Sequence, residues 1–326
     1  MTKPRGGGGG AGASGGGRVV CAVLNAAVDI TYIAEHFAAG QSNRVSEVHA
    51  QAGGKGVNVA RLLHQAGHDV TVTGFAGGLV GDEIAAHLDA WGLAHRFVRC
   101  AAGSRRTVSA FSVQDAAVTA YNEDGPQVTG AEWATFTGRF PGLVRGARLV
   151  IMSGSLPGGI PADAYRTLAR MAADAGAAAF VDAHPTALLA AVGAEPALVK
   201  PNEHELAEAA GLTVPMSLPA AVHASRRLLT DGAQSVVVSL GPRGLVGVLP
   251  AMTMLAVPPT QRGNPIGAGD AALAALADGH LAGRPWPARL RRAAAMSAAA
   301  ARQPVAGVVD PGDVAELEAL TEVTEI

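Results

Sequence analysis

The most informative stretch of the sequence is GNPIGAGDAA, which runs from Gly263 to Ala272. A turn rich in Gly and Pro leads here directly into an Ala/Leu pattern that predicts a helix. Glycines leave backbone amides open to a ligand, and the amino-terminal end of a helix attracts negative charge. The stretch therefore predicts an anion hole around Gly267 and Gly269, suited to a phosphoryl group in transfer.

Asp270 falls in the first turn of this helix, where its carboxylate can accept the proton of an attacking hydroxyl. Two other interpretations compete. An isolated Asp at the start of a helix is most often only a cap. The run Gly267-x-Gly269-x-x-Ala272 also matches the dinucleotide-binding fingerprint, which opens a first βαβ unit and has an acidic residue ~20 positions later. Here the run lies late in the chain and the sequence near residue 290 is basic, so this interpretation fails on context.

A second glycine-rich turn, GGKGVNVAR at Gly53–Arg61, precedes another helical pattern. Its paired glycines let a ligand approach the backbone, and the Asn58 amide can both donate and accept hydrogen bonds. It is not a Walker A loop, because Gly56 rather than Ser or Thr follows Lys55. Taken alone, such a turn is as often structural as functional.

Outward from these motifs, short β-type runs alternate with Ala/Leu-rich helical runs, which predicts an α/β fold with a mainly parallel sheet flanked by helices. Strands are expected at Arg18–Leu24, Val70–Phe75, Leu149–Met152, Ala178–Asp182, Ala197–Lys200 and Ser235–Ser239. Helices are expected at Val57–Ala66, Asp82–Trp91, Ala162–Ala175, Glu203–Ala210, Ala220–Thr230, Asp270–Leu281 and Ala288–Arg302.

Two extended, more polar runs interrupt this alternation, at about residues 30–52 and 97–119. Neither contains a long helical pattern. We expect them to form a small β-lid that pairs with itself over the edge of the sheet. Such a lid would exclude water from a site at the carboxyl ends of the strands.

The composition narrows the class of protein. A net charge of −2 over 326 residues disfavours nucleic acid as a partner, and no apolar run is long enough to span a membrane. Two cysteines form neither a disulfide framework nor a zinc motif, which favours a cytoplasmic location. Nine of the first 17 residues are Gly, so we expect a disordered tail at 1–17 and one domain over 18–326.

The two glycine-rich motifs together resemble the two signatures of the ribokinase-like, or PfkB, carbohydrate kinases. The resemblance runs from about Val19 to about Arg302. Further blocks match in the family's order: Leu24-Asn25 to Asp29, Asn122–Pro126, Gly154–Pro157, Lys200–Glu205 and Ser239–Gly244.

The resemblance implies a sugar kinase that uses ATP and Mg²⁺, with Asp270 as its base and Gly267, Ala268 and Gly269 as its anion hole. It implies further roles residue by residue. The residues that match the family's sugar-binding positions are Asp29, Gly53, Gly54 and Asn58. Those that match its positions for placing magnesium and phosphate are Asn202 and Glu205. Those that match its ATP pocket are Ser239, Gly241 and Gly244. A homodimer through the lid is compatible with the resemblance.

Within the family, the chain is most similar to the branch that phosphorylates ketohexose phosphates, such as 1-phosphofructokinase and tagatose-6-phosphate kinase. A phosphorylated substrate needs cations, and Lys55 and Arg106 match that branch. Arg105 and Arg106 could equally be solvated lid residues. Asn264-Pro265 departs from the Asp-Thr of many relatives, and Pro265 removes a hydroxyl and a backbone donor.

Two other functions stay open at this point. One is a kinase of the same fold acting on an unphosphorylated sugar or a nucleoside. The other is a catalytically silent sugar-binding protein, against which the intact Asp270, Asn202 and Glu205 argue. A hydrolase is disfavoured because the sequence has no Gly-x-Ser-x-Gly elbow.

Overall fold

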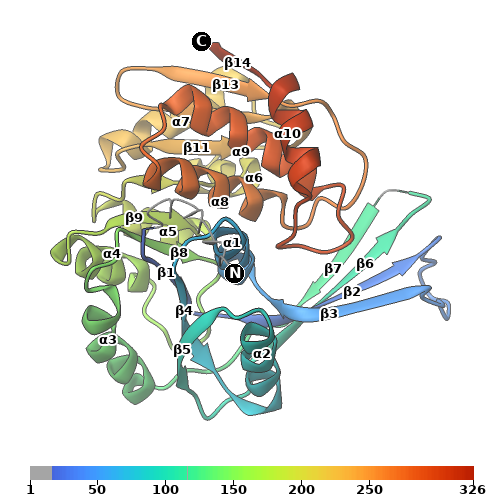
Figure 1. Cartoon of the computed structure of the whole chain (residues 1–326), viewed down its shortest axis with the longest axis vertical. Coiled ribbons are helices and arrows are strands. Elements are labelled where there is room, and N and C mark those ends of the chain that lie inside the picture. The colour runs from blue at the N-terminus through green and yellow to red at the C-terminus, as the bar shows by residue number, and fades with distance from the viewer. Residues whose placement is uncertain (1–16, 116) are drawn as a thin grey trace, which may run out of the picture.

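The computed structural model describes residues 17–115 and 117–326, and its main body is a ten-stranded sheet covered by helices on both faces (Figure 1). The strand order is β14-β13-β12-β11-β10-β9-β8-β1-β4-β5. The strands are β1 (Val19–Val23), β4 (Val70–Ala76), β5 (Ala94–Arg99), β8 (Leu149–Ser153), β9 (Ala178–Asp182), β10 (Leu198–Val199), β11 (Val236–Ser239), β12 (Leu245–Val248), β13 (Thr253–Val257) and β14 (Glu322–Glu325). Pairing is parallel from β5 through β11 and antiparallel from β11 to β14.

The helices divide between the two faces of this sheet. One face carries α1 (Lys55–Gln65), α2 (Gly78–Ala90), α8 (Ala268–Leu281), α9 (Trp286–Ala300) and α10 (Pro311–Leu320). The other carries α3 (Gly130–Val144), α4 (Ala164–Asp174), α5 (Pro185–Val192), α6 (Glu203–Ala210) and α7 (Leu218–Thr230). A single 3₁₀ turn, η1 (Gly241–Arg243), follows β11.

Strand β1 shows why helices must cover both faces of the sheet. All five of its residues are buried. Val19, Cys21 and Val23 pack in the core beneath α1 and α8, whereas Val20 and Ala22 pack in the core beneath α3 and α4. Successive side chains of a strand point to opposite faces, so an uninterrupted apolar run requires helices on both sides.

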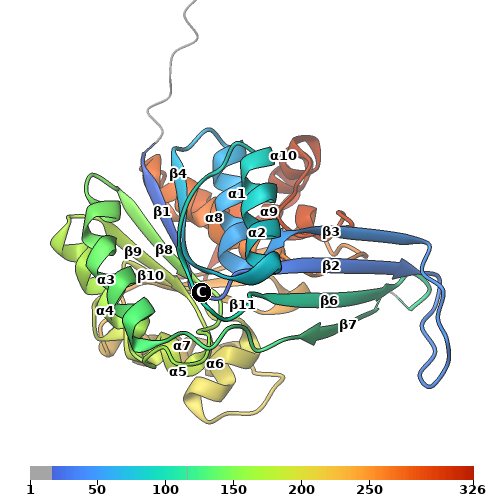
Figure 2. The same ribbon diagram turned by 90° about the horizontal axis from the view of Figure 1, so that it is seen from below.

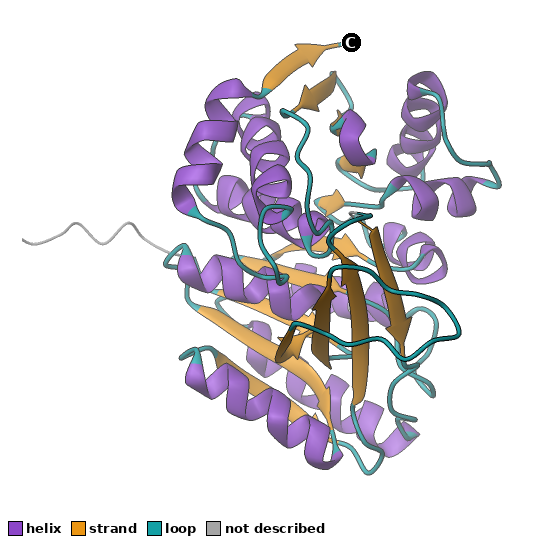
Figure 3. Ribbon diagram, turned by 90° about the vertical axis from the view of Figure 1, so that its right-hand side faces the viewer, coloured by secondary structure: helices purple, strands orange, loops and turns teal. Residues whose placement is uncertain are grey.

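A second, four-stranded sheet projects from this body (Figures 2 and 3). It consists of β2 (Ala27–Ala34), β3 (Glu47–Gly53), β6 (Arg105–Ser112) and β7 (Ala117–Asn122), in the order β3-β2-β6-β7. Strands β2 and β6 are parallel neighbours, and each also pairs antiparallel with its own hairpin partner. We refer to these four strands as the lid sheet.

The expected α/β fold with a mainly parallel sheet is confirmed, and several boundaries are corrected. The lid sheet begins at Ala27 rather than at residue 30 and ends at Asn122 rather than at 119. Residues 97–99 belong instead to β5, which pairs with β4 in the main sheet.

The expected tail at 1–17 lies outside the described residues except for Gly17. That residue is buried, and a Cβ added there would meet Arg148 Cδ at 2.9 Å, so the expectation was wrong at this position. Within residues 17–115 and 117–326, no helix is both long and apolar enough to cross a membrane.

Candidate active site

The cavity that we assign as the active site lies between the carboxyl ends of the parallel strands and the lid sheet. Its volume is about 1410 Å³. Asp29 and Thr107 line it from the lid sheet, Asp270 from the start of α8, and Ser239 from the end of β11. Segments far apart in the sequence therefore converge where ligands bind to open α/β sheets.

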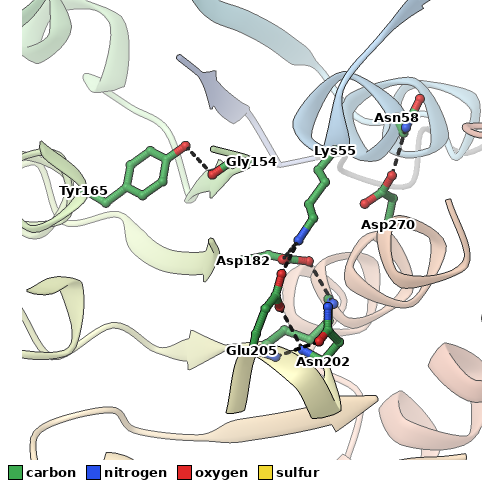
Figure 4. Close-up of polar contacts among 9 residues, drawn as sticks. Lys55, Asn58, Gly154, Tyr165, Asp182, Asn202, Glu205 and Asp270 are labelled. Carbon is green, nitrogen blue, oxygen red and sulfur yellow. Dashed lines mark hydrogen bonds and ion pairs between the residues drawn. The ribbon is translucent and has the colours of Figure 1, made fainter. Parts of the chain in front are cut away.

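Asp270 is the third residue of α8 and is 6% exposed. Its Oδ2 accepts a hydrogen bond of 2.8 Å from Asn58 Nδ2, which comes from α1 (Figure 4). Burial, reinforced by the nearby carboxylate of Asp182, raises the pKa of Asp270 to about 7, although the Asn58 hydrogen bond acts in the opposite direction. A carboxylate with such a pKa is suited to accept a proton near neutral pH.

The turn before α8 depends on glycine and on Asn264. Gly267 has φ 81°, and a Cβ there would lie 2.6 Å from Ala306 Cβ. Asn264 is buried; its Oδ1 accepts from the Ile266 amide, and its Nδ2 donates to the Pro304 carbonyl. Asn264 thus supplies the local hydrogen bonds that shape this turn.

The anion hole needs one correction. The amide of Ala268 already donates to the carbonyl of Pro265, at 3.2 Å. That hydrogen bond uses the donor that we expected to face a phosphoryl group. The amides of Gly267 and Gly269, which flank it, stay our prediction for the anion hole.

A network of ions lies beside Asp270 (Figure 4). Lys55 Nζ is 3.0 Å from Asp182 Oδ1 and 2.8 Å from Glu205 Oε1, and Lys200 Nζ is 2.8 Å from Asp182 Oδ2. Burial alone would raise the pKa of Asp182, but the two lysines outweigh it and lower that pKa. Burial alone would lower the pKa of Lys55, but the two carboxylates raise it.

Lys55 was expected at the phosphate already carried by the sugar, and it does line the cavity. Its ammonium group lies between the ends of β9 and α6 rather than against the lid sheet. Sequence reasoning did not assign Asp182 or Lys200 to the site. Asp182 is the last residue of β9 and Lys200 follows β10, and this position at the carboxyl edge of the sheet is the signal that could have identified them.

Asn202 and Glu205 form a capping box at the start of α6. Glu205 Oε2 accepts from the Asn202 amide at 2.9 Å, and Asn202 Oδ1 accepts from the Glu205 amide at 2.8 Å. Across the described ranges, no three His, Cys, Asp or Glu side chains converge as a metal cage. Mg²⁺ in kinases is held by one or two carboxylates together with substrate phosphates, and Glu205 beside Asp182 fits that arrangement.

The lid sheet contributes a second carboxylate, that of Asp29. Its Oδ2 accepts from the Gly54 amide at 3.1 Å, and its Oδ1 accepts from the Thr107 hydroxyl. A Cβ at Gly53 would lie 2.0 Å from Asp29 Oδ2, so only glycine leaves room for this carboxylate. Of the residues expected at the sugar, Asp29, Gly54 and Asn58 line the cavity, whereas Gly53 does not.

Arg106, expected to hold a phosphate, does not line the cavity. Its guanidinium lies 3.9 Å from Glu83 Oε2. The neighbouring Arg105 lines the cavity instead, with Nε donating to Asn25 O at 3.1 Å and Nη1 to Glu123 O at 3.3 Å. Side chains alternate along β6, so a shift of one residue exchanges the two faces of the lid sheet.

The opposite end of the cavity contains the residues expected at the nucleotide. Ser239, Gly241 and Gly244 all line it, together with Pro258, Ala294 and Ser297. Gly244 has φ 92°, and a Cβ there would lie 2.0 Å from the Ala256 carbonyl oxygen. Leu240 and Leu245 of the same segment also line the cavity. Glycine backbone and apolar side chains at this end suit a flat aromatic base.

Comparisons with known proteins agree with this geometry. The family described as pfkB family carbohydrate kinase matches residues 19–311. A 1-phosphofructokinase from Rhodobacter capsulatus is 39% identical over 264 residues, which cover 79% of this chain and 82% of that protein.

Two solved structures illustrate the shared fold. Phosphofructokinase-2 from Escherichia coli, in complex with substrates and products, superposes with a TM-score of 0.85 at 24% identity, covering 93% of this chain and 98% of that one. Ribokinase from Arabidopsis thaliana, complexed with ribose and ATP, gives a TM-score of 0.73 at 20% identity, covering 93% and 99%. The chain belongs to the pfkB family of carbohydrate kinases.

Proposed function

We propose that the protein transfers the γ-phosphoryl group of ATP to a hydroxyl of a ketohexose phosphate, as a 1-phosphofructokinase or a tagatose-6-phosphate kinase does. The relative from Rhodobacter capsulatus carries the first of these names. The single observation that favours a phosphorylated substrate is Arg105, a cation at the lid end of the cavity. The sugar lies at this end and the nucleotide at the end formed by Ser239–Gly244.

The reaction is an in-line displacement without a covalent enzyme intermediate. Asp270 accepts the proton of the sugar hydroxyl while its oxygen bonds to the γ-phosphorus, and the bond from that phosphorus to the β,γ-bridging oxygen breaks to release ADP. Asn58 orients the base through its hydrogen bond to Asp270 Oδ2. Lys55 and Lys200 supply positive charge beside the transferred group.

Mg²⁺ would be held near Glu205 and Asp182, chiefly by the phosphates of ATP, and would neutralise their charge. Lys55 bridges these two carboxylates, and Lys200 also contacts Asp182. Because these lysines offset the carboxylate charge, the phosphates of ATP would supply most of the ligands of the ion.

Arg105 and Arg106 offer a matched test of the substrate class. Arg105→Ala should raise KM for the preferred phosphosugar about 10- to 100-fold, because a charge-assisted hydrogen bond contributes about 1.5–3 kcal/mol and about 1.4 kcal/mol is a factor of ten. Arg106→Ala is the control, since that guanidinium lies outside the cavity. Neither change should alter KM for ATP.

An ADP-release assay should accompany these variants, with fructose 1-phosphate, tagatose 6-phosphate, fructose 6-phosphate, fructose and ribose as acceptors. A preference of the wild type for a free sugar would overturn the phosphosugar assignment and favour the alternative of a kinase for unphosphorylated sugars. Equal effects of the two arginine variants would remove the argument from Arg105. Absence of ADP release with every acceptor would favour a silent sugar-binding protein.

We also propose that two copies associate through the lid sheet, in keeping with a cytoplasmic homodimer. Tyr121 and Val48 are 64% and 55% exposed. The register places Tyr121 opposite Val108 and Val48 opposite Tyr32, so apolar side chains form adjacent rows across the strands. Tyr121→Asp should convert the dimer to a monomer in light scattering, whereas an unchanged mass, or a monomeric wild type, would contradict the association.

A further inference from the structure

Asn25 lies in the turn between β1 and β2, where the chain leaves the main sheet for the lid sheet. The residue is 5% exposed and lines the cavity. Its Nδ2 donates to the Asp124 carbonyl at 2.9 Å and to Ser155 Oγ at 3.0 Å. Its own carbonyl accepts from Arg105 Nε at 3.1 Å. One buried residue thus connects the base of β6, the segment after β7 and the loop after β8.

The Asp124 carbonyl fixes which way the Asn25 amide points. A carbonyl can only accept, so the NH₂ group must face it, and the Oδ1 atom must point away. That oxygen is buried without a hydrogen-bond partner among the described residues. It points toward Gly125, where a Cβ would lie 2.1 Å from it. An unpaired buried acceptor is unfavourable, so the retained amide indicates that its two donated bonds matter.

The same orientation fixes the direction of the hydrogen bond between Asn25 and Ser155. Because Ser155 Oγ accepts from Asn25, its own hydrogen is available to another acceptor. Ser155 is exposed and lines the cavity, so that acceptor can be a bound molecule. Arg105 is also a donor without acceptor capacity. Two donors that share one anchor suit an anionic oxygen better than a hydroxyl, which needs an acceptor for its own proton.

We propose that Asn25 is a positioning residue that presents Ser155 and Arg105 as hydrogen-bond donors to the phosphate already carried by the sugar. The choice of phosphate rests on the proposed function. Asn25 acts on Ser155 through its side chain and on Arg105 through its main chain. A side-chain substitution should therefore act through Ser155 and leave the Arg105 contact in place.

A double-mutant cycle in KM for fructose 1-phosphate tests this coupling. Asn25→Ala and Ser155→Ala should each raise KM about tenfold, and the double variant should also show about tenfold rather than about 100-fold. The KM for ATP should not change. Asn43→Ala is the control, because Asn43 lies outside the cavity, in the loop between β2 and β3, and its side chain also forms hydrogen bonds with backbone, at Ala38.

Asn25→Asp extends the test with a side chain of the same shape, should the alanine variant fold poorly. The new carboxylate accepts a hydrogen bond from the Ser155 hydroxyl, which is then no longer available to donate to a ligand. The carboxylate also repels a phosphate. We expect a larger rise in KM than for Asn25→Ala, measured on protein whose thermal midpoint shows it to be folded.

Additive effects of Asn25→Ala and Ser155→Ala would overturn the proposal, as would equal rises in KM for sugar and ATP or no rise at all. Repeating the cycle with free fructose separates the two hypotheses. Coupling confined to the phosphorylated sugar supports both. Equal coupling with free fructose would retain the positioning role and reject the phosphate as its target.

Discussion

The carboxyl group of Asp270 combines burial with a function that requires ionisation. Its pKa of about 7 lies well above that of an exposed Asp, chiefly because burial penalises the charge. The unfolded chain loses this proton near pH 4, whereas the folded protein retains it until about pH 7. Stability should therefore fall as the pH rises from 4 to 7 and stay reduced above that, by up to about 4 kcal/mol.

Asp270→Asn should separate the two consequences. Turnover should fall about 10²- to 10⁴-fold through loss of the general base, while the thermal midpoint should rise at pH 8 and scarcely change at pH 4. In the wild type, kcat/KM should increase with pH through about 7. Rate profiles and thermal melts at both pH values provide the measurements. Turnover within a few-fold of wild type would reduce Asp270 to a helix cap.

The individual residues were predicted unevenly, and the reason is geometric. Asp270 and Asn58 come from glycine-rich turns before helices, where the local pattern fixes which residue faces the site, and their side chains do meet. Arg106 was expected from the family resemblance, and two consecutive arginines do not show which of them faces the cavity, because that depends on the pairing register of the strand. Asp182 and Lys200 meet only through long-range packing of β9 and β10, and no local pattern encodes that contact.

Helix α8 should be the element most sensitive to its first turn. Gly267→Ala forces an L-residue into a left-handed conformation, at about 1–2 kcal/mol, and drives its Cβ against Ala306. Gly283→Ala is the matched control at the other end of the same helix, since Gly283 has φ 65° but open space for a Cβ. Both variants should lose stability, and only Gly267→Ala should also lose kcat. Comparable kcat values for the two would contradict a role of this turn in catalysis.

Some elements were not predicted. Helix α3 contains Gly138, Pro141 and Gly142, which weaken the helical pattern in the sequence. The helix is held by tertiary packing, in which the rings of Phe136 and Phe75 lie 5.1 Å apart between centroids. Its Thr129–Glu132 capping box was the available local signal. Strands β12 to β14 were missed because short antiparallel strands at the edge of the sheet lack the strand–helix alternation on which the analysis relied.

At the scale of the whole molecule, the two sheets should differ in their hydrogen exchange. Strands β1 and β8 are buried throughout, whereas most residues of β3 and β7 are at least partly exposed. Amides of the lid sheet should exchange faster than those of the main sheet. Saturating sugar should slow them because Asp29 and Thr107 of the lid sheet line the cavity in which we propose that the sugar binds. Exchange measured by mass spectrometry gives the comparison. Unchanged lid exchange at saturation would argue against closure over the sugar.

The overall architecture was predictable because alternation of strand and helix patterns leaves few topologies. The existence of a polar excursion from that alternation was also visible in the sequence. Its limits were not, because β5 and β6 follow one another closely and only pairing assigns Ala94–Arg99 to the main sheet.

Glycines in the cavity wall leave no room for a larger residue. Gly244 and Gly267 both line the cavity, and neither tolerates a Cβ. Because these positions are closed to substitution, evolution toward another acceptor must proceed through the polar side chains that line the cavity. Arg105, Thr107 and Ser155 are three of them. A directed-evolution library restricted to these three codons should contain most of the accessible changes in acceptor preference.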